Sequence, residues 1–272
     1  DRSQQVKFDG MLSSSCKITR SIIQGSGLRP TLYIVMESDL HPMSDWINLL
    51  FKFADDTNLI VPQITDFSAK VEIGNIKMWA LENKMEINWE KTMELVFRRP
   101  STELSLLPDP LCNIEQVLEA RLLGVVINGK FNFTSHVNKL LSICSQRMFL
   151  LKILKQQGLP LEKLNIIYNA IIVSRITYAL PVWAGFLTAD LTNRINALLV
   201  KSFRYGYTKQ CNNLSKLISQ MDDSFFKSLK YPGHCAHYLL PPPKAVGHNL
   251  RQRGHNYQLP LCKYNQQKNS FI

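Results

Sequence analysis

The spacing of apolar residues changes near residue 130, and this change limits the possible folds more than any other feature. Before it, apolar residues occur in short, strand-like runs between turn-forming residues. After it they recur every three or four residues, as on one face of a helix. Three such stripes are present: Val137, Leu140, Leu141, Cys144, Met148 and Leu151; Leu164, Ile167, Tyr168 and Ile171; and Leu191, Ile195, Leu198 and Leu199. The pattern predicts an α+β chain, mixed over residues 1–130 and helical over residues 131–206.

The charge of the chain is concentrated at its carboxy-terminal end. The 272 residues are 45% hydrophobic and 19% charged, an ordinary globular composition, and the net charge is +11. Residues 201–272 hold 11 basic residues against two acids, Asp222 and Asp223. Such a basic segment favours a polyanionic partner. Because Asn, Pro and Lys are frequent from residue 207, we expect residues 207–272 to be basic and largely irregular.

Residues 164–187 form the most apolar long stretch, but Asn165, Asn169 and Pro181 interrupt it and Arg175 lies near its centre. A central Arg costs about 2.5–3.5 kcal/mol on insertion into a bilayer, so we expect a buried protein helix and no membrane partner. The six cysteines are scattered without paired spacing, which predicts reduced thiols in an intracellular protein.

The segment FKFADDTNLI, residues 51–60, predicts a strand, a turn and a second strand. Phe51 and Phe53 alternate with other residues on one side of Asp55 and Asp56, and an apolar run follows on the other. Two interpretations of the adjacent acids are open. They are either a solvated turn, since Asp favours turns, or a magnesium site, since a divalent cation relieves the repulsion between neighbouring carboxylates.

Other local signals mark the remaining elements before residue 130. Residues 24–27 predict a loop, and Pro30 suits the first turn of a following helix. A second helix is expected to start at Asp66 or Ser68. Residues 122–127 form an apolar run that predicts one strand, and the Asn128-Gly129 pair after it predicts a hairpin turn.

Four segments in this order resemble the motifs of one enzyme family. QGSGL at 24–28, FADD at 53–56, INWEKT at 87–92 and LLGVVI at 122–127 are similar to motifs B, C, D and E of reverse transcriptases from non-LTR (LINE-type) retrotransposons, nearest to jockey-like elements. The ending HYLLPPPKAVGHNLRQRGHNYQLP resembles the end of the same polyproteins. The resemblance implies a partial polymerase palm with an antiparallel sheet and packed helices over residues 1–130, a thumb over 131–206, and a carboxy-terminal segment over 207–272.

The family implies an RNA-directed DNA polymerase that copies retrotransposon RNA into DNA by two-metal nucleotidyl transfer. By resemblance Asp55 and Asp56 are catalytic ligands of Mg²⁺, or of Mn²⁺, and Lys91 supplies a proton or positive charge to the departing pyrophosphate. The substrate-binding loop is Gln24, Gly25 and Ser26, and the primer grip is Leu123 and Gly124. The alternatives are a solvated lysine for Lys91, an ordinary Gly turn for Gln24, Gly25 and Ser26, and a buried apolar strand for Leu123 and Gly124.

The implied partners are an RNA template, a DNA primer and dNTPs. Side chains expected to contact nucleic acid are Arg194, Lys201 and Arg204 in the thumb and Arg251 and Arg253 near the end, although ordinary solvated charge is the simpler explanation for any one of them. The resemblance also implies intracellular action, in nucleus and cytoplasm, as an element ribonucleoprotein.

The third metal ligand of the family, in motif A, would lie upstream of Asp1. We therefore expect the missing fingers and motif A segment of the same polyprotein to be required, and this chain to be inactive by itself. Leu28-Arg29-Pro30 departs from the Leu-Gly-Pro of the family, which fits a decayed copy. A noncatalytic nucleic-acid-binding relic of a retroelement is accordingly the rival interpretation.

A third interpretation is a zinc-dependent interaction module in the carboxy-terminal segment, which is rich in histidine and cysteine. No pair there has the tight Cys-x2-4-Cys spacing of a structural zinc site, so incidental loop residues are the simpler explanation. The residues in question are His234, Cys235, His237, His248, His255 and Cys262.

Overall fold

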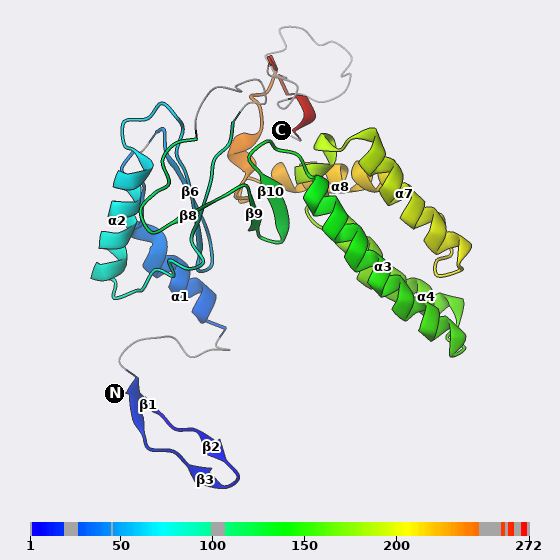
Figure 1. The fold of residues 1–272 in the computed structure, drawn as a ribbon, viewed down its shortest axis with the longest axis horizontal. Helices are drawn as coiled ribbons and strands as arrows, with labels where there is room; N and C mark the ends of the chain where they lie inside the picture. Colours follow the sequence, from blue (N-terminus) through cyan, green and yellow to red (C-terminus); the bar gives the residue numbers. More distant parts are fainter. Residues whose placement is uncertain are drawn as a thin grey trace. The chain divides into compact units, whose positions relative to one another are not determined.

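The computed structural model describes residues 2–18, 27–44, 46–98, 107–244, 257–258, 261–263 and 268–270 (Figure 1). The chain forms two compact units: unit 1 is Asp1–Thr92 with Pro110–Ile114, and unit 2 is Met93–Asp109 with Glu115–Ile272. This division differs from the expected boundary at residue 130, because the short strands that follow Thr92 belong to the same unit as the helices.

The described residues of unit 1 form short antiparallel strand pairs and two α-helices. β1 pairs with β4, β2 with β3, and β5 with β6. Both helices start as predicted, with Pro30 in the first turn of α1 and Ser68 as the N-cap of α2. In chain order the elements are β1 (Arg2–Gln4), β2 (Lys7–Phe8), β3 (Met11–Leu12), β4 (Cys16–Ile18), α1 (Arg29–Met36), η1 (Glu37–Asp39), β5 (Leu49–Phe53), β6 (Asp56–Ile60) and α2 (Ala69–Glu82).

The interior of unit 1 is built around the carboxylate of Glu72 on α2, which is fully buried. Its oxygens accept hydrogen bonds from the backbone N–H groups of Met43 (2.8 Å) and Ser44 (3.1 Å) and from the side-chain amide of Asn48 (2.7 Å). Asn48 is also buried and accepts a hydrogen bond from the hydroxyl of Thr65 at 2.7 Å. This network fastens the segment that leads into β5 to α2.

Unit 2 combines two strand pairs with a helical body. β9 pairs antiparallel with β10, whereas β7 pairs parallel with β8. Helix α3 packs against α4 and α7, and α8 packs against α6 and α7 (Figure 1). The elements are β7 (Met93–Leu95), β8 (Glu115–Val117), β9 (Glu119–Leu122), β10 (Val125–Asn128), α3 (Thr134–Gln156), α4 (Leu161–Tyr168), the π-helical η2 (Asn169–Val173), α5 (Ser174–Thr177), α6 (Leu180–Trp183), η3 (Ala184–Phe186), α7 (Ala189–Arg204), α8 (Leu214–Leu229) and η4 (His237–Leu239).

The α+β class is confirmed, but the strands do not form the expected antiparallel palm sheet. In the described residues the named strands make separate two-stranded pairs, and β7 with β8 is parallel. Short strands of two to five residues offer few ladder hydrogen bonds, so each pair depends on the helices and loops around it.

The predicted helical stripes form the core of unit 2. The fully buried side chains include Val137, Cys144 and Leu151 of α3 and Ile195 and Leu199 of α7. The side chain of Thr188 caps α7, because it accepts a hydrogen bond from the backbone N–H of Leu191 (3.3 Å).

The stretch Leu161–Phe186 is long and apolar enough to cross a membrane by length and composition. It is not one regular helix, because the π-helical η2 interrupts it, Tyr178 is extended, and Ala179 has a left-handed φ of 51°. One face of the stretch packs into the core cluster through every fourth side chain: Leu164, Tyr168, Ile172, Ile176 and Leu180. The predicted buried helix is thus only partly buried, since Ile166, Tyr178 and Val182 are exposed.

Residues 207–272 were expected to be largely irregular, but Leu214–Leu229 form a regular helix, α8. Asn213 caps α8 by accepting a hydrogen bond from the backbone N–H of Ser215 (2.8 Å). Leu214 and Leu217 belong to the core cluster of unit 2. Frequent Asn and Lys residues concealed an apolar stripe of helical spacing, so the helical body extends at least to Leu229.

Replacing Glu72 with Gln should lower the free energy of unfolding of unit 1 by about 2–3 kcal/mol, because an amide nitrogen would face donors that need an acceptor. Hydrogen exchange of the α2 amides, followed by mass spectrometry, measures the loss. Glu82→Gln, an exposed position on the same helix, is the control and should leave exchange unchanged. Equal exchange in both variants would contradict the role of Glu72.

The stability of unit 2 should fall as the pH drops below about 6.5. His136 is buried against Trp183, its Nδ1 accepts the backbone N–H of Val126 at 3.3 Å, and burial lowers its pKa. Below the ordinary pKa the unfolded chain therefore binds a proton that the folded chain does not, until the lowered folded pKa is reached. Denaturant titrations at several pH values measure this. His136→Gln should flatten the dependence, whereas His41→Gln, at an exposed position, should not.

Candidate functional site

Asp55 and Asp56 lie at the tip of the hairpin formed by β5 and β6. Phe53 pairs with Asp56, which leaves Ala54 and Asp55 as a two-residue turn. Ala54 has a left-handed φ of 51°, a conformation that costs about 1 kcal/mol for a residue with a Cβ atom. Both acids are exposed. The predicted strand, turn, strand arrangement is therefore confirmed, with two adjacent carboxylates facing solvent.

Hydrogen bonds to the segment after α1 hold one face of this hairpin. The buried carboxylate of Glu37 accepts a hydrogen bond from the hydroxyl of Thr57 on β6 (3.0 Å). The ammonium of Lys52 on β5 donates to the carbonyl oxygens of Glu37 and of Leu40, the latter at 2.8 Å. Lys52 and Thr57 are a cross-strand pair, so both strands are joined to the same segment.

Tyr33 on α1 adds a phenol near the acids. Burial raises its pKa, and the negative charges of Glu37 and Asp55 raise it further. Because its pKa is raised, Tyr33 stays protonated at neutral pH and retains an O–H donor.

Lys91 lies on a turn that precedes β7, and its side chain is exposed. Its backbone N–H is held by the backbone carbonyl and the side-chain oxygen of Asn88, both at 3.2 Å. None of the hydrogen bonds or ion pairs recorded for the described part of the chain joins Lys91 to Asp55 or Asp56. Its predicted role stays a prediction.

Several predicted site residues lie outside the described residues: Gln24, Gly25, Ser26, Arg251 and Arg253.

No three His, Cys, Asp or Glu side chains come together as a metal site anywhere in the described ranges. His234, Cys235 and His237 thus form no zinc cluster there, and His248 and His255 lie outside those ranges. The same result means that Asp55 and Asp56 are a pair without a third carboxylate from the described residues.

Leu123 and Gly124 form a tight turn rather than part of one strand. They join β9 to β10, and both have positive φ, 45° for Leu123 and 92° for Gly124. Two positive φ values are typical of the type I′ turn that matches strand twist. Tyr178 covers this turn: its hydroxyl donates to the Leu123 carbonyl at 2.6 Å. A Cβ atom on Gly124 would lie 3.3 Å from the Tyr178 ring.

The predicted hairpin at Asn128-Gly129 is wrong. The Asn128 side-chain oxygen accepts the backbone N–H groups of Lys130 (3.2 Å) and Asn132 (3.0 Å), which turns the chain toward α3 instead. Gly129 is needed for close approach, because a Cβ atom there would lie 2.3 Å from the carbonyl oxygen of Val96. In this part of the chain the hairpin turn is made at Gly124, between β9 and β10.

The predicted thumb cations are exposed on α7. Arg194 donates to the side-chain oxygen of Asn138 on α3 (2.8 Å) and lies 3.9 Å from the Asp190 carboxylate. Lys201 lies 5.6 Å from the ring centre of Tyr205, and Arg204 borders a shallow surface depression with both. These charges remain accessible to a ligand.

Three residues that matter in the structure carry no signal in the sequence: Tyr33, Glu37 and Tyr178. Their roles follow from neighbours 20 or more residues away, as in the pairs Glu37 with Thr57 and Tyr178 with Leu123. No local pattern marks such residues. The left-handed turn at Gly124 had a signal, a glycine inside a strand-like run, which commonly indicates a turn or bulge.

Two curated proteins are similar to this chain. The RNA-directed DNA polymerase from mobile element jockey of Drosophila melanogaster is 27% identical over 223 residues, which is 75% of this chain and 24% of that protein. The protein of the same description from Drosophila funebris is 25% identical over 222 residues, 75% of this chain and 23% of its own length.

The chain is homologous to jockey RNA-directed DNA polymerases. The resemblance to jockey-like reverse transcriptases, which the order of the four motifs indicated, is thereby confirmed. The chain spans about a quarter of the length of the jockey proteins it matches. No family model and no solved structure matches it.

Replacing Tyr178 with Phe should loosen the Leu123-Gly124 turn, because the left-handed Leu123 loses its hydrogen bond while the ring stays over the glycine. We expect the turn to lose about 1 kcal/mol of stability and the β10 amides to exchange several-fold faster. Hydrogen exchange by NMR measures this, with Tyr231→Phe, an exposed tyrosine, as control. Unchanged exchange would show that Tyr178 does not hold the turn.

Proposed function

We propose that this chain is part of an RNA-directed DNA polymerase that copies retrotransposon RNA into DNA, with Asp55 and Asp56 in its metal site. The observation that supports the proposal best is the exposed pair of acids at the turn of a tight hairpin, in a chain homologous to jockey polymerases. If Asp55 and Asp56 were only turn residues, neither the homology nor the order of the motifs around them would be explained.

The residues present fit a hard divalent cation. Mg²⁺ and Mn²⁺ prefer carboxylate oxygens, and adjacent carboxylates repel each other until a cation lies between them. Neither acid takes part in an ion pair formed by the described residues. When bound, such ions would polarise phosphate oxygens and stabilise the attacking and leaving oxygens of nucleotidyl transfer.

The surrounding residues have separate duties in this proposal. The hydrogen bonds of Glu37, Thr57 and Lys52 hold the hairpin in one orientation, which keeps the acids preorganised. Lys91 would offer positive charge or a proton to departing pyrophosphate. RNA template, DNA primer and dNTPs are the substrates, with Gln24, Gly25 and Ser26 near the nucleotide and Leu123 and Gly124 near the primer.

We further propose that this chain does not extend a primer by itself. Adjacent acids on one hairpin cannot surround two metal ions, so a carboxylate from another strand is required. No third metal-binding side chain joins Asp55 and Asp56 from the described residues. The proposed source is the fingers and motif A segment of a longer polyprotein, acting inside the cell, in nucleus and cytoplasm, as a ribonucleoprotein.

A second candidate is a noncatalytic nucleic-acid-binding protein. It is favoured by Arg29, which stands where the family resemblance expects glycine. Glycine permits close backbone packing that a long cation obstructs. In this alternative the basic helices of unit 2 retain their partner while Asp55 and Asp56 have no catalytic role.

A primer-extension assay with Mg²⁺, RNA template and dNTPs tests the proposal. The chain alone should give no extension, whereas the chain joined to its upstream segment should extend. In the joined form Asp55→Asn should lower the rate at least about a hundredfold, since a lost metal ligand removes transition-state stabilisation. Asp109→Asn, at an exposed acid of unit 2, is the matched control.

Extension by the 272-residue chain alone would contradict the need for an upstream segment. Equal rates for Asp55→Asn and the unmodified joined form would contradict the metal site. No extension by the joined form, together with tight nucleic-acid binding, would favour the noncatalytic alternative.

A further inference from the structure

Helices α3 and α7 lie side by side and run in the same direction. At one end Asn138 of α3 accepts a hydrogen bond from Arg194 of α7 (2.8 Å). At the other end Lys155 of α3 donates to the carbonyl oxygen of Tyr205, directly after α7 (2.7 Å). Between these ties the facing side chains leave a groove of about 560 Å³. The groove is open to solvent along the helices.

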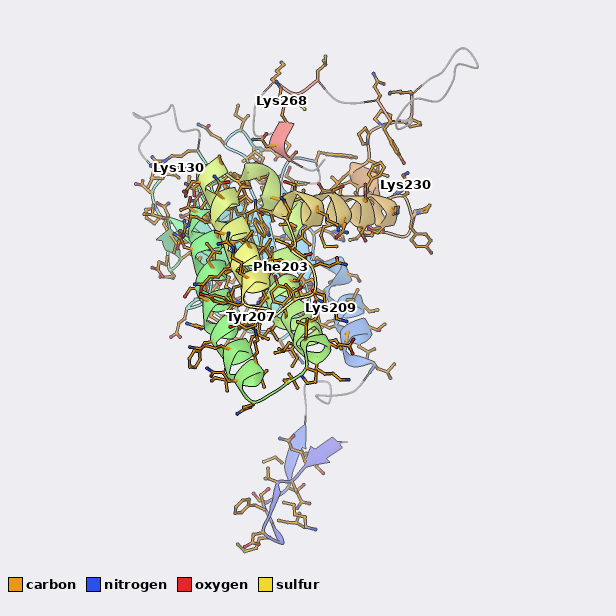
Figure 2. All side chains as sticks on the ribbon, turned by 90° about the vertical axis from the view of Figure 1, so that its right-hand side faces the viewer. Lys130, Phe203, Tyr207, Lys209, Lys230 and Lys268 are labelled. Atoms are coloured by element: carbon orange, nitrogen blue, oxygen red, sulfur yellow. The ribbon has the colours of Figure 1, made fainter. Side chains whose placement is uncertain are left out.

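The groove combines an apolar floor with exposed aromatic rings. Leu141, Met148 and Leu198 contribute to the floor. Phe149 is 61% exposed and Tyr205 is 48% exposed, although large aromatic side chains are often buried in the core. Tyr207, buried and labelled in Figure 2 just beyond α7, lies edge-on to Tyr205 with ring centres 5.8 Å apart.

The charge around the groove is positive. Lys152, Arg194 and Lys201 line it, and no acidic side chain does. Helix α3 contains no Asp or Glu, and α7 contains one acid, Asp190. Lys201 lies 5.6 Å from the centre of the Tyr205 ring, so a cation and an aromatic face are presented together. A polyanion is the ligand that these charges complement.

We propose that this groove binds single-stranded nucleic acid, with bases stacked on Phe149 and Tyr205 and phosphates beside Lys152 and Lys201. Stacking on a protein ring needs a free base face, and inside a duplex both faces are covered by neighbouring base pairs. An unpaired strand therefore fits the rings, whereas a duplex uses only the cations. An acidic peptide likewise satisfies the cations but has no aromatic face to offer.

This inference goes beyond the polymerase proposal and does not rest on it. The groove involves neither Asp55 nor Asp56, and binding there requires no metal ion. It also differs from the duplex contacts expected for a thumb, because the exposed rings select unpaired bases.

The test uses the 272-residue chain without Mg²⁺ and fluorescence anisotropy with labelled oligonucleotides. The probes are a single-stranded RNA, a single-stranded DNA, a duplex of the same length, a strand in which abasic sites replace the bases, and poly-glutamate. Wild-type protein should bind either single strand about tenfold more tightly than the abasic strand, because ring stacking is lost without bases.

Variants then separate stacking from charge. The double variant Phe149→Leu and Tyr205→Leu should bind the normal strand as weakly as the abasic one, with an unchanged salt dependence. Lys152→Gln should weaken all strands and lower the slope of log K against log salt by about 0.7. The matched controls are Tyr231→Leu and Lys230→Gln, two residues that directly follow α8; Lys230 lies away from Tyr207 in Figure 2.

Equal affinity for normal and abasic strands would overturn the proposal, and this comparison needs no variant. Duplex or poly-glutamate binding as tight as single-strand binding would overturn it too. This binding assay contains no Mg²⁺ and no dNTPs, so its failure and the failure of primer extension are separate results.

Discussion

The buried carboxylate of Glu72 is the interaction on which the candidate site depends. It accepts three hydrogen bonds from the segment that leads into β5, and it does so without solvent. A charge in such a place is tolerated because several donors replace its water. Apart from Leu40, Ala80 and Ile114, the buried residues described in unit 1 are polar, so hydrogen bonds position the hairpin as much as apolar packing does. This network therefore helps to fix the position of Asp55 and Asp56 at the turn.

Unit 2 is organised by the opposite principle. A continuous apolar cluster from α3 to α8 holds its helices, and the most apolar stretch is broken so that each piece can turn its buried face inward. The break at Tyr178 and Ala179 has a second effect, since it brings the Tyr178 hydroxyl to the strained Leu123-Gly124 turn. Strain at one place is thus offset by a hydrogen bond from another, as is common near functional sites.

The two units suggest different kinds of function. Unit 1 offers exposed carboxylates and a protonated phenol, groups suited to a metal ion and phosphate oxygens. Unit 2 offers cations and exposed rings between α3 and α7, groups suited to a nucleic-acid strand. Homology to jockey polymerases is consistent with both. A measurement of metal binding and of nucleic-acid binding would show which of the two properties is maintained in this chain.

Local patterns in the sequence were enough to predict the elements that have a strong hydrophobic period or a clear turn signal. Alternating apolar residues around Asp55 and Asp56 were enough for the hairpin, and the spacing of Val137, Cys144 and Leu151 was enough for α3. The stripe beginning at Leu214 was equally readable, but its polar surroundings concealed helix α8. The order of four short motifs also identified the family, because motif order is a property of the chain alone.

Only the tertiary structure decided which glycine makes the hairpin and which polar residues are buried. Position 129 must be glycine because the Val96 carbonyl oxygen lies where a Cβ atom would be. Gly124 is the residue at which the chain turns, beneath the Tyr178 ring. Likewise Glu72 resembles any other helix-surface acid until Met43, Ser44 and Asn48 surround it. The physical reason is the same in each case. Steric limits and desolvation depend on atoms that are distant in sequence, and their effect exists only once the chain has brought those atoms together.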